Sequence, residues 1–103
     1  MKLAIITAAL LSIAAPAVAQ EAMPLLRVYV DTPYFYEIML TGNEMSEAGR
    51  RLELVVEGKE VGASTIEYDC ANGQYSESVT TPWTGSANAY IPAALMAYNN
   101  LFC

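Results

Sequence analysis

The chain has 103 residues, no histidine and a formal net charge of −6 at pH 7. The missing histidine removes the commonest general base and the usual zinc ligand, so we expect neither a metal site nor a cofactor. The acidic balance disfavours nucleic acids and anionic membrane surfaces as partners, whereas it allows a basic protein partner.

Residues 1–19 have the composition of a secretory signal peptide. Lys2 supplies a positive charge, residues 3–16 are uncharged and mostly apolar, and residues 17–19 (AVA) form the small-x-small pattern that precedes a cleavage site. The apolar stretch is shorter than the roughly 20 residues that a bilayer requires, which argues against a membrane anchor. We therefore expect an exported protein, in the periplasm or at the cell surface. Residues 20–103 would form one small domain without a membrane span.

The two cysteines of the chain are the obvious cross-link for such a domain. Cleavage leaves four basic against eleven acidic residues, an excess of seven negative charges on a chain with a small core and marginal stability. In an oxidising compartment a lone pair of cysteines most often forms a disulfide. A reactive thiol would lack a histidine as base, and the acidic neighbours Glu67 and Asp69 disfavour a thiolate. We predict a disulfide between Cys70 and Cys103.

Most of the expected domain reads as extended strands separated by turn residues. The polar segment 43–50 is interpreted as a loop with at most one helical turn. The pair at 58–59 (GK) then turns the chain into a short extended piece around Val61. The expected strands are 25–30, 36–40, 52–57, 65–70 and 74–79.

A hairpin is expected around the first cysteine. Period-2 alternation places Ile66, Tyr68 and Cys70 on one face of the strand at 65–70. The Asn-Gly pair at 72–73 favours a two-residue type I′ turn, in which both central residues take a positive φ. A returning strand then follows.

The end of the chain has the pattern of an amphipathic helix. Its apolar stripe is Ile91, Leu95, Tyr98 and Phe102. Pro92 suits a first helical turn, and Ser86 or Asn88 is expected to act as a cap. The disulfide would pin this helix to the sheet. We predict an α+β fold, an antiparallel sheet of four to six strands packed against a C-terminal helix, with one disulfide.

Ten aromatic residues are a second conspicuous feature, because Tyr and Trp are favoured at recognition surfaces. Periodicity places Tyr68, Tyr98 and Phe102 in the core. The remaining candidates lie in or beside turn-rich segments, where they form either an exposed partner-binding patch or the edge of a small core. The candidates for the patch are Tyr34, Phe35, Tyr36 and Trp83.

Several short motifs resemble the surface-adhesin protein E family of small exported bacterial proteins. They are VYVD at 28–31, EYDC at 67–70 with an aromatic strand after it, Pro-Trp at 82–83, and a terminal helix that ends in cysteine. The resemblance implies an antiparallel sheet packed with a C-terminal helix, and a disulfide at the matching positions Cys70 and Cys103. Some members are adhesins that bind host matrix and serum proteins. The resemblance therefore implies a non-catalytic binding or envelope protein with a protein partner.

Two alternatives rest on the same segment. The string at 68–73 is similar to the Tyr-x-Cys-x-x-Gly opening of periplasmic lysozyme inhibitors, and an acidic inhibitor would suit a basic enzyme. Glu67 and Asp69 lie about 7 Å apart on one strand face, a separation compatible with the carboxylates of a hydrolase such as a glycosidase. Acidic proteins more often leave such pairs in solvent, so we expect no enzyme. Exposed strand edges leave the oligomeric state open, an edge-strand dimer included.

Overall fold

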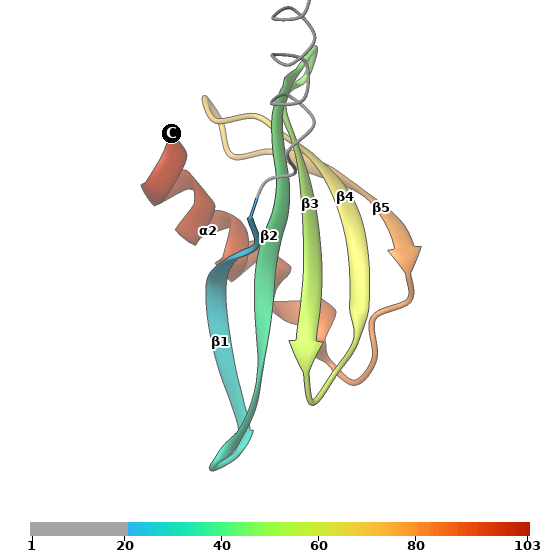
Figure 1. The fold of residues 1–103 in the computed structure, drawn as a ribbon. Helices are drawn as coiled ribbons and strands as arrows, with labels where there is room; N and C mark the ends of the chain where they lie inside the picture. The colour runs from blue at the N-terminus through green and yellow to red at the C-terminus, as the bar shows by residue number, and fades with distance from the viewer. Residues whose placement is uncertain (1–20) are drawn as a thin grey trace, which may run out of the picture.

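Five strands in sequence order form a single antiparallel sheet (Figure 1). The computed structural model describes residues 21–103, so the expected signal peptide at 1–19 lies outside the described residues. The strands are β1 (Met23–Asp31), β2 (Tyr34–Ser46), β3 (Gly49–Gly58), β4 (Gly62–Tyr68) and β5 (Tyr75–Thr81). A 3₁₀ turn, Ala87–Tyr90, leads into the helix α2 (Ile91–Phe102). The predicted α+β architecture is confirmed.

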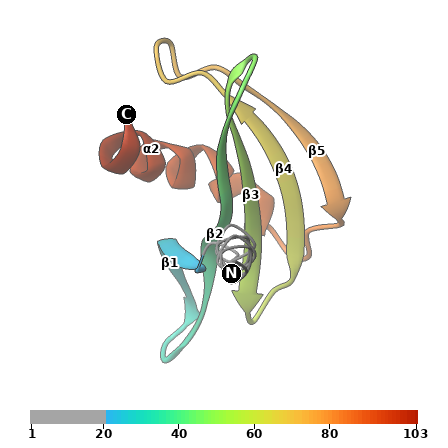
Figure 2. The same cartoon turned by 45° about the horizontal axis from the view of Figure 1, so that its top comes forward.

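The inner face of the sheet forms the core with α2. Directly opposite residues of antiparallel strands share a face, so the apolar positions of neighbouring strands line up into one surface. Each fully buried Leu or Ile stabilises the fold by about 1.5–3 kcal/mol. The fully buried sheet residues are Ile38, Leu40, Leu52, Leu54 and Ile66, and the helix adds Ile91, Ala94, Leu95 and Tyr98. Figure 2 shows α2 lying against the concave side of the curved sheet.

The helix begins and ends close to the predicted positions. Ile91 is its first residue and Pro92 lies in its first turn, while Phe102 is its last. The predicted side-chain caps are not found. Ser86 occupies the N-cap position of the 3₁₀ turn and Tyr90 that of α2, but no side chain bonds to the free N–H groups at either place. The missing N–H of Pro92 removes one donor that a cap would otherwise have to satisfy.

The predicted disulfide is present. Cys70 in the turn after β4 is bonded to Cys103, directly after α2, with a Cα–Cα distance of 5.7 Å. The bond joins residues that are 33 positions apart, which on the chain-entropy model destabilises the unfolded chain by about 4 kcal/mol. It therefore fixes the end of α2 to the sheet.

The prediction of a loop at 43–50 is wrong. β2 and β3 continue to Ser46 and Gly49, so that only two residues separate the strands. On the inner face Asn43 and Arg50 bond to Tyr98 of α2, and other polar side chains bond across the outer face of the sheet. The Ser46 hydroxyl donates to Glu67 at 2.8 Å, and Arg51 donates to the same carboxylate at 2.7 Å. These side-chain bonds explain how a polar segment forms strands without apolar alternation.

The turn between β4 and β5 also differs from its prediction. Gly73 has φ 75°, and among the described residues only glycines have a positive φ. A type I′ turn requires a positive φ at both central residues, so the Asn-Gly pair does not form one. A wider turn forms instead. The Gly73 N–H donates to the Asp69 carbonyl at 2.8 Å, and the Asp69 carboxylate accepts the Ala71 N–H at 2.8 Å. Asp69 thereby closes the turn that carries Cys70.

Candidate functional site: an aromatic tip

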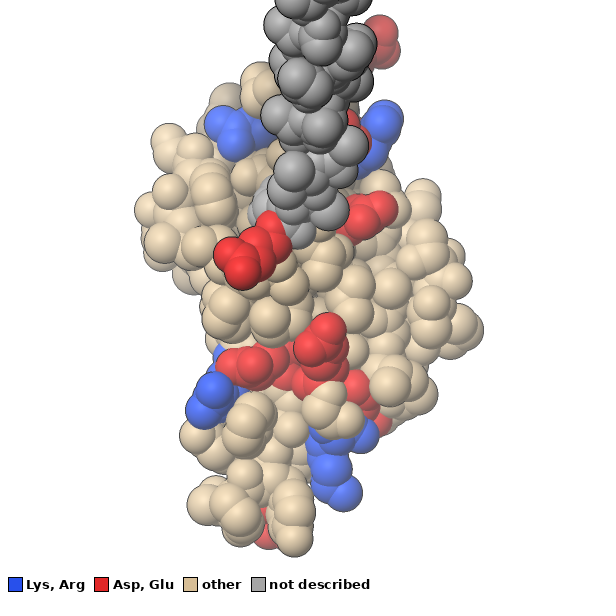
Figure 3. Space-filling model, in the orientation of Figure 1, with Lys and Arg blue, Asp and Glu red and all other residues tan. Residues whose placement is uncertain are grey.

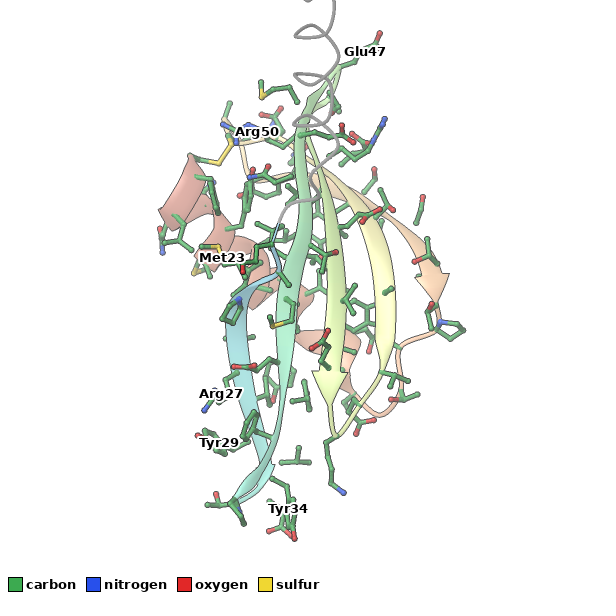
Figure 4. The ribbon with its side chains drawn as sticks, viewed as in Figure 1. Met23, Arg27, Tyr29, Tyr34, Glu47 and Arg50 are labelled. Atoms are coloured by element: carbon green, nitrogen blue, oxygen red, sulfur yellow. A yellow bond between two sulfur atoms is a disulfide. The ribbon has the colours of Figure 1, made fainter. Side chains whose placement is uncertain are left out.

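An exposed aromatic cluster occupies the end of the β1–β2 hairpin. Tyr29 of β1 lies opposite Phe35 of β2, so both rings project from the outer face of the sheet. The ring centroids are 5.5 Å apart in an edge-to-face arrangement. Tyr29 is 55% exposed and Tyr34 is 58% exposed. Figure 4 shows both tyrosines at the lower end of the molecule, away from the helix.

Two cations lie over these rings. The guanidinium carbon of Arg27 is 4.1 Å from the centroid of the Phe35 ring, and the Lys59 ammonium is 5.6 Å from that of Tyr34. Such cation–π contacts hold rings and cations in defined positions. Arg27 also donates to the Tyr29 hydroxyl at 3.4 Å. We call these five residues, Arg27, Tyr29, Tyr34, Phe35 and Lys59, the aromatic tip.

Carboxylates lie beside the aromatic tip on the outer face. Glu37 accepts two hydrogen bonds from Arg27, at 2.9 and 3.1 Å. The hydrogen bond to Tyr29 and the bond to Glu37 raise the pKa of Arg27. Glu57 of β3 lies directly opposite Glu37, so two like charges are neighbours. In Figure 3 the acidic side chains form a band across the strands, with basic side chains directly below it.

The structure places Tyr36 in the core and not in an exposed patch, so this part of the prediction is wrong. Tyr36 is 4% exposed. Its side chain lies on the inner face of the sheet, as do those of Ile38 and Leu40. Its ring packs edge-to-face against Tyr90, with 6.3 Å between the ring centroids. Burial raises the pKa of the Tyr36 hydroxyl. Residues two positions apart in a strand lie on the same face, so the position of Tyr36 two residues before Ile38 was the signal that it lies inside.

Trp83 is half-buried and packs over β4. Its indole N–H donates to the Ser64 hydroxyl at 2.8 Å. A Cβ on Gly62 would lie 2.7 Å from the Trp83 Cα, so the close approach requires glycine there. The prediction grouped Trp83 with Tyr34 and Phe35, whereas the tip residue that contacts Phe35 is Tyr29.

Glu67 and Asp69 line a shallow hollow of about 500 Å³ at the C-terminal end of β4. Hydrogen bonds from Arg51 and then Ser46 lower the pKa of Glu67, whereas the general acid of a glycosidase requires a raised one. Asp69 accepts a backbone hydrogen bond within its turn. These bonds give both carboxylates structural roles. The absence of catalysis stays a prediction.

Sequence reasoning did not group Arg27, Tyr29 and Lys59 with the patch. The turn residues at 31–33 (DTP), between the expected strands 25–30 and 36–40, contained the signal for Tyr29. A tight turn there brings the flanking strands back alongside each other and places Tyr29 near Phe35. Among residues 21–103, no helix combines the length and the apolar character needed to span a bilayer. Comparisons with family models, with curated proteins and with solved structures found no match to this chain.

Proposed function

We propose that this chain is a non-catalytic exported bacterial protein that binds a protein partner through the aromatic tip, in the manner of a surface adhesin. The observation that carries the proposal is the exposure of Tyr29 and Tyr34 beside Arg27 on one hairpin. Tyr and Arg are the residues in which binding energy concentrates at protein interfaces. The resemblance to the surface-adhesin protein E family supports the same role.

The internal contacts of the aromatic tip favour binding. Arg27 is held by Phe35, Tyr29 and Glu37 before any partner arrives. Ordering flexible side chains costs about 0.5–1.5 kcal/mol each on association, so side chains that are already ordered bind more tightly. The carboxylates of Glu37 and Glu57 next to the tip favour a partner whose apolar contact area is flanked by basic groups.

Surface plasmon resonance over immobilised, purified matrix and serum proteins tests this proposal. For a panel member that binds, Tyr34→Ala is expected to weaken the affinity by about tenfold or more, because truncating an interface hot spot has effects of that size. Leu101→Ala is the matched control, since it removes an exposed apolar side chain from α2, away from the aromatic tip. Equal affinities for both variants, or no binding to any panel member, would contradict the proposal.

A further inference from the structure

The two edges of the sheet are protected to different degrees. The β1 edge contains Pro24 and Arg27, and its register with β2 shifts twice, after Pro24 and after Tyr29. Proline, charged side chains and bulges are the usual devices that prevent an edge strand from pairing with another chain. The β5 edge has seven consecutive exposed residues with no proline, no lysine and a single charge, Glu77. The register between β4 and β5 shifts only once, between Ala63 and Ser64, at the C-terminal end of β5.

The register of β5 identifies its free backbone groups. The Asp69 N–H donates to the Gln74 carbonyl at 3.0 Å, and bonded and non-bonded pairs alternate along an antiparallel ladder. Ser76 and Ser78 therefore bond to β4. The residues between and beside them, Tyr75, Glu77 and Val79, direct their N–H and C=O groups to the open edge.

The side chains of the same three residues face the helix side of the sheet. They lie opposite Tyr68, Ile66 and Ser64, which are all buried. α2 does not cover β5, because the helix lies nearer to β1 (Figure 2). As a result, Tyr75 and Val79 remain 41% and 56% exposed on an inner face.

A groove of about 240 Å³ runs between the start of β5 and α2. Tyr75 forms one wall, Leu95 and Met96 of α2 form the other, and most of the lining is apolar. At its floor the Asn99 amide donates to the Tyr68 hydroxyl at 2.7 Å, so the polar groups there are already paired. The groove has room for an apolar side chain that enters from the β5 edge.

We propose that the β5 edge binds an extended peptide segment of a partner as a sixth strand, with the pattern apolar-x-basic-x-apolar. Strand addition takes its affinity from backbone hydrogen bonds and its specificity from alternate side chains. A side chain opposite Tyr75 meets the groove, one opposite Glu77 meets a carboxylate, and one opposite Val79 meets an apolar surface. Residues 21–103 carry four basic and eleven acidic side chains, and this negative excess favours a basic segment.

The proposed pattern is the same in both chain directions, so it applies to a parallel or an antiparallel addition. It does not depend on the aromatic tip, which lies on the β1–β2 hairpin at the other edge of the sheet. Each surface is therefore open to its own partner.

An array of synthetic nine-residue peptides tests the pattern, with Leu, Lys, Glu and Thr permuted over the five central positions. Peptides with the centre Leu-Thr-Lys-Thr-Leu are expected to bind about tenfold more tightly than those with Leu-Thr-Glu-Thr-Leu, because the second centre places a carboxylate opposite Glu77. Glu77→Lys should reverse this preference. Leu101→Ala, at an exposed position of α2 outside the groove, should leave peptide binding unchanged.

Two variants at one edge position test the backbone part of the proposal. Val79→Pro removes an N–H from the open edge without removing a bond to β4, and should weaken peptide binding about tenfold or more. Val79→Ile keeps both the N–H and the apolar surface, and should bind as the wild type does. If Val79→Pro does not fold, the reversal by Glu77→Lys decides the matter.

Three results would overturn the proposal. One is an array in which no peptide binds. Another is a best peptide whose affinity changes neither in Val79→Pro nor in Glu77→Lys. The third is a wild-type dimer, detected by light scattering, that Val79→Pro converts to a monomer, because a second copy of the chain would then occupy the β5 edge.

Discussion

The two ends of the molecule are held together in different ways. At the upper end of Figure 1, the disulfide joins α2 to the turn after β4, and the Tyr98 hydroxyl links three elements. It donates to Asn43 of β2 at 2.7 Å and accepts from Arg50 of β3 at 2.9 Å. At the lower end, the β1–β2 hairpin extends beyond the helix, and the contacts of Arg27 and Lys59 with exposed rings take the place of a core.

This difference suggests that the upper end of the sheet provides stability and that the aromatic tip provides binding. Changes at the upper end should cost stability, because they remove a cross-link or leave half-buried polar groups without a partner. Changes at the aromatic tip should cost binding with little loss of stability, since exposed side chains away from the core contribute little to the free energy of unfolding.

The strongest test of the division is the loss of the disulfide. Replacing both cysteines, Cys70→Ala with Cys103→Ala, should lower the free energy of unfolding by about 4 kcal/mol, because the unfolded chain regains the entropy that the cross-link removes. Urea unfolding measures this loss, and reduced wild-type protein is the control. A loss below about 1 kcal/mol would mean that the upper end does not depend on the cross-link.

Tyr98→Phe tests the hydrogen-bond network beneath the helix. The change leaves Asn43 and Arg50 without their buried partner and should destabilise the protein by about 1–3 kcal/mol. Tyr90→Phe is the matched control on the same side of the sheet, since Tyr90 is 40% exposed, and its effect should stay within about 0.5 kcal/mol. Equal losses for the two variants would show that the network adds no stability.

The aromatic tip provides the opposite case. Tyr34→Ala should change the free energy of unfolding by no more than about 0.5 kcal/mol, because the ring is mostly exposed, even though partner binding is expected to fall. Urea unfolding of this variant beside the wild type measures the difference. A loss of 2 kcal/mol or more would make the tip part of the stable framework and would remove the distinction between the two ends.

The smallest expected effect concerns acid. The pKa of Glu67 is lowered from its ordinary value of 4.5 by hydrogen bonds from Arg51 and Ser46. A lowered pKa in the folded state stabilises the fold at pH values above the ordinary one, and this stabilisation is lost as the pH falls through the folded-state pKa. Glu67→Gln should therefore melt below the wild type at pH 7, and the two melting temperatures should converge under acid. A constant difference down to pH 2 would contradict the assigned cause.

The elements with strong patterns were predictable from sequence. The helix stripe from Ile91 to Phe102 and the two cysteines gave the α+β fold and the cross-link, because helical spacing and pairing of the only two thiols leave few alternatives. The extension of β2 and β3 through 43–50 was not predictable from local pattern. Its stability comes from bonds such as that of Ser46 to Glu67, between residues distant in sequence.

The candidate site was only partly predictable for the same reason. Tyr34 and Phe35 were recognised from their place beside a turn, whereas the contact of Arg27 with the Phe35 ring depends on the strand register. The turn-rich residues before Tyr36 favour an exposed position, whereas strand alternation places it in the core. Period-2 alternation was the better guide at that position, since a residue two before buried Ile38 faces the same side.

The order of the strands also bears on how the chain folds. Every strand of the sheet pairs with its neighbour in sequence, so each ladder grows from a hairpin between adjacent segments. Proteins rich in such local contacts fold faster than those that must first join distant parts of the chain. The long-range steps are the docking of α2, whose Tyr98 bonds to Asn43 over 55 residues, and the pairing of Cys70 with Cys103. The meander should therefore assemble first, with α2 docking onto a finished sheet and oxidation of the thiols coming last.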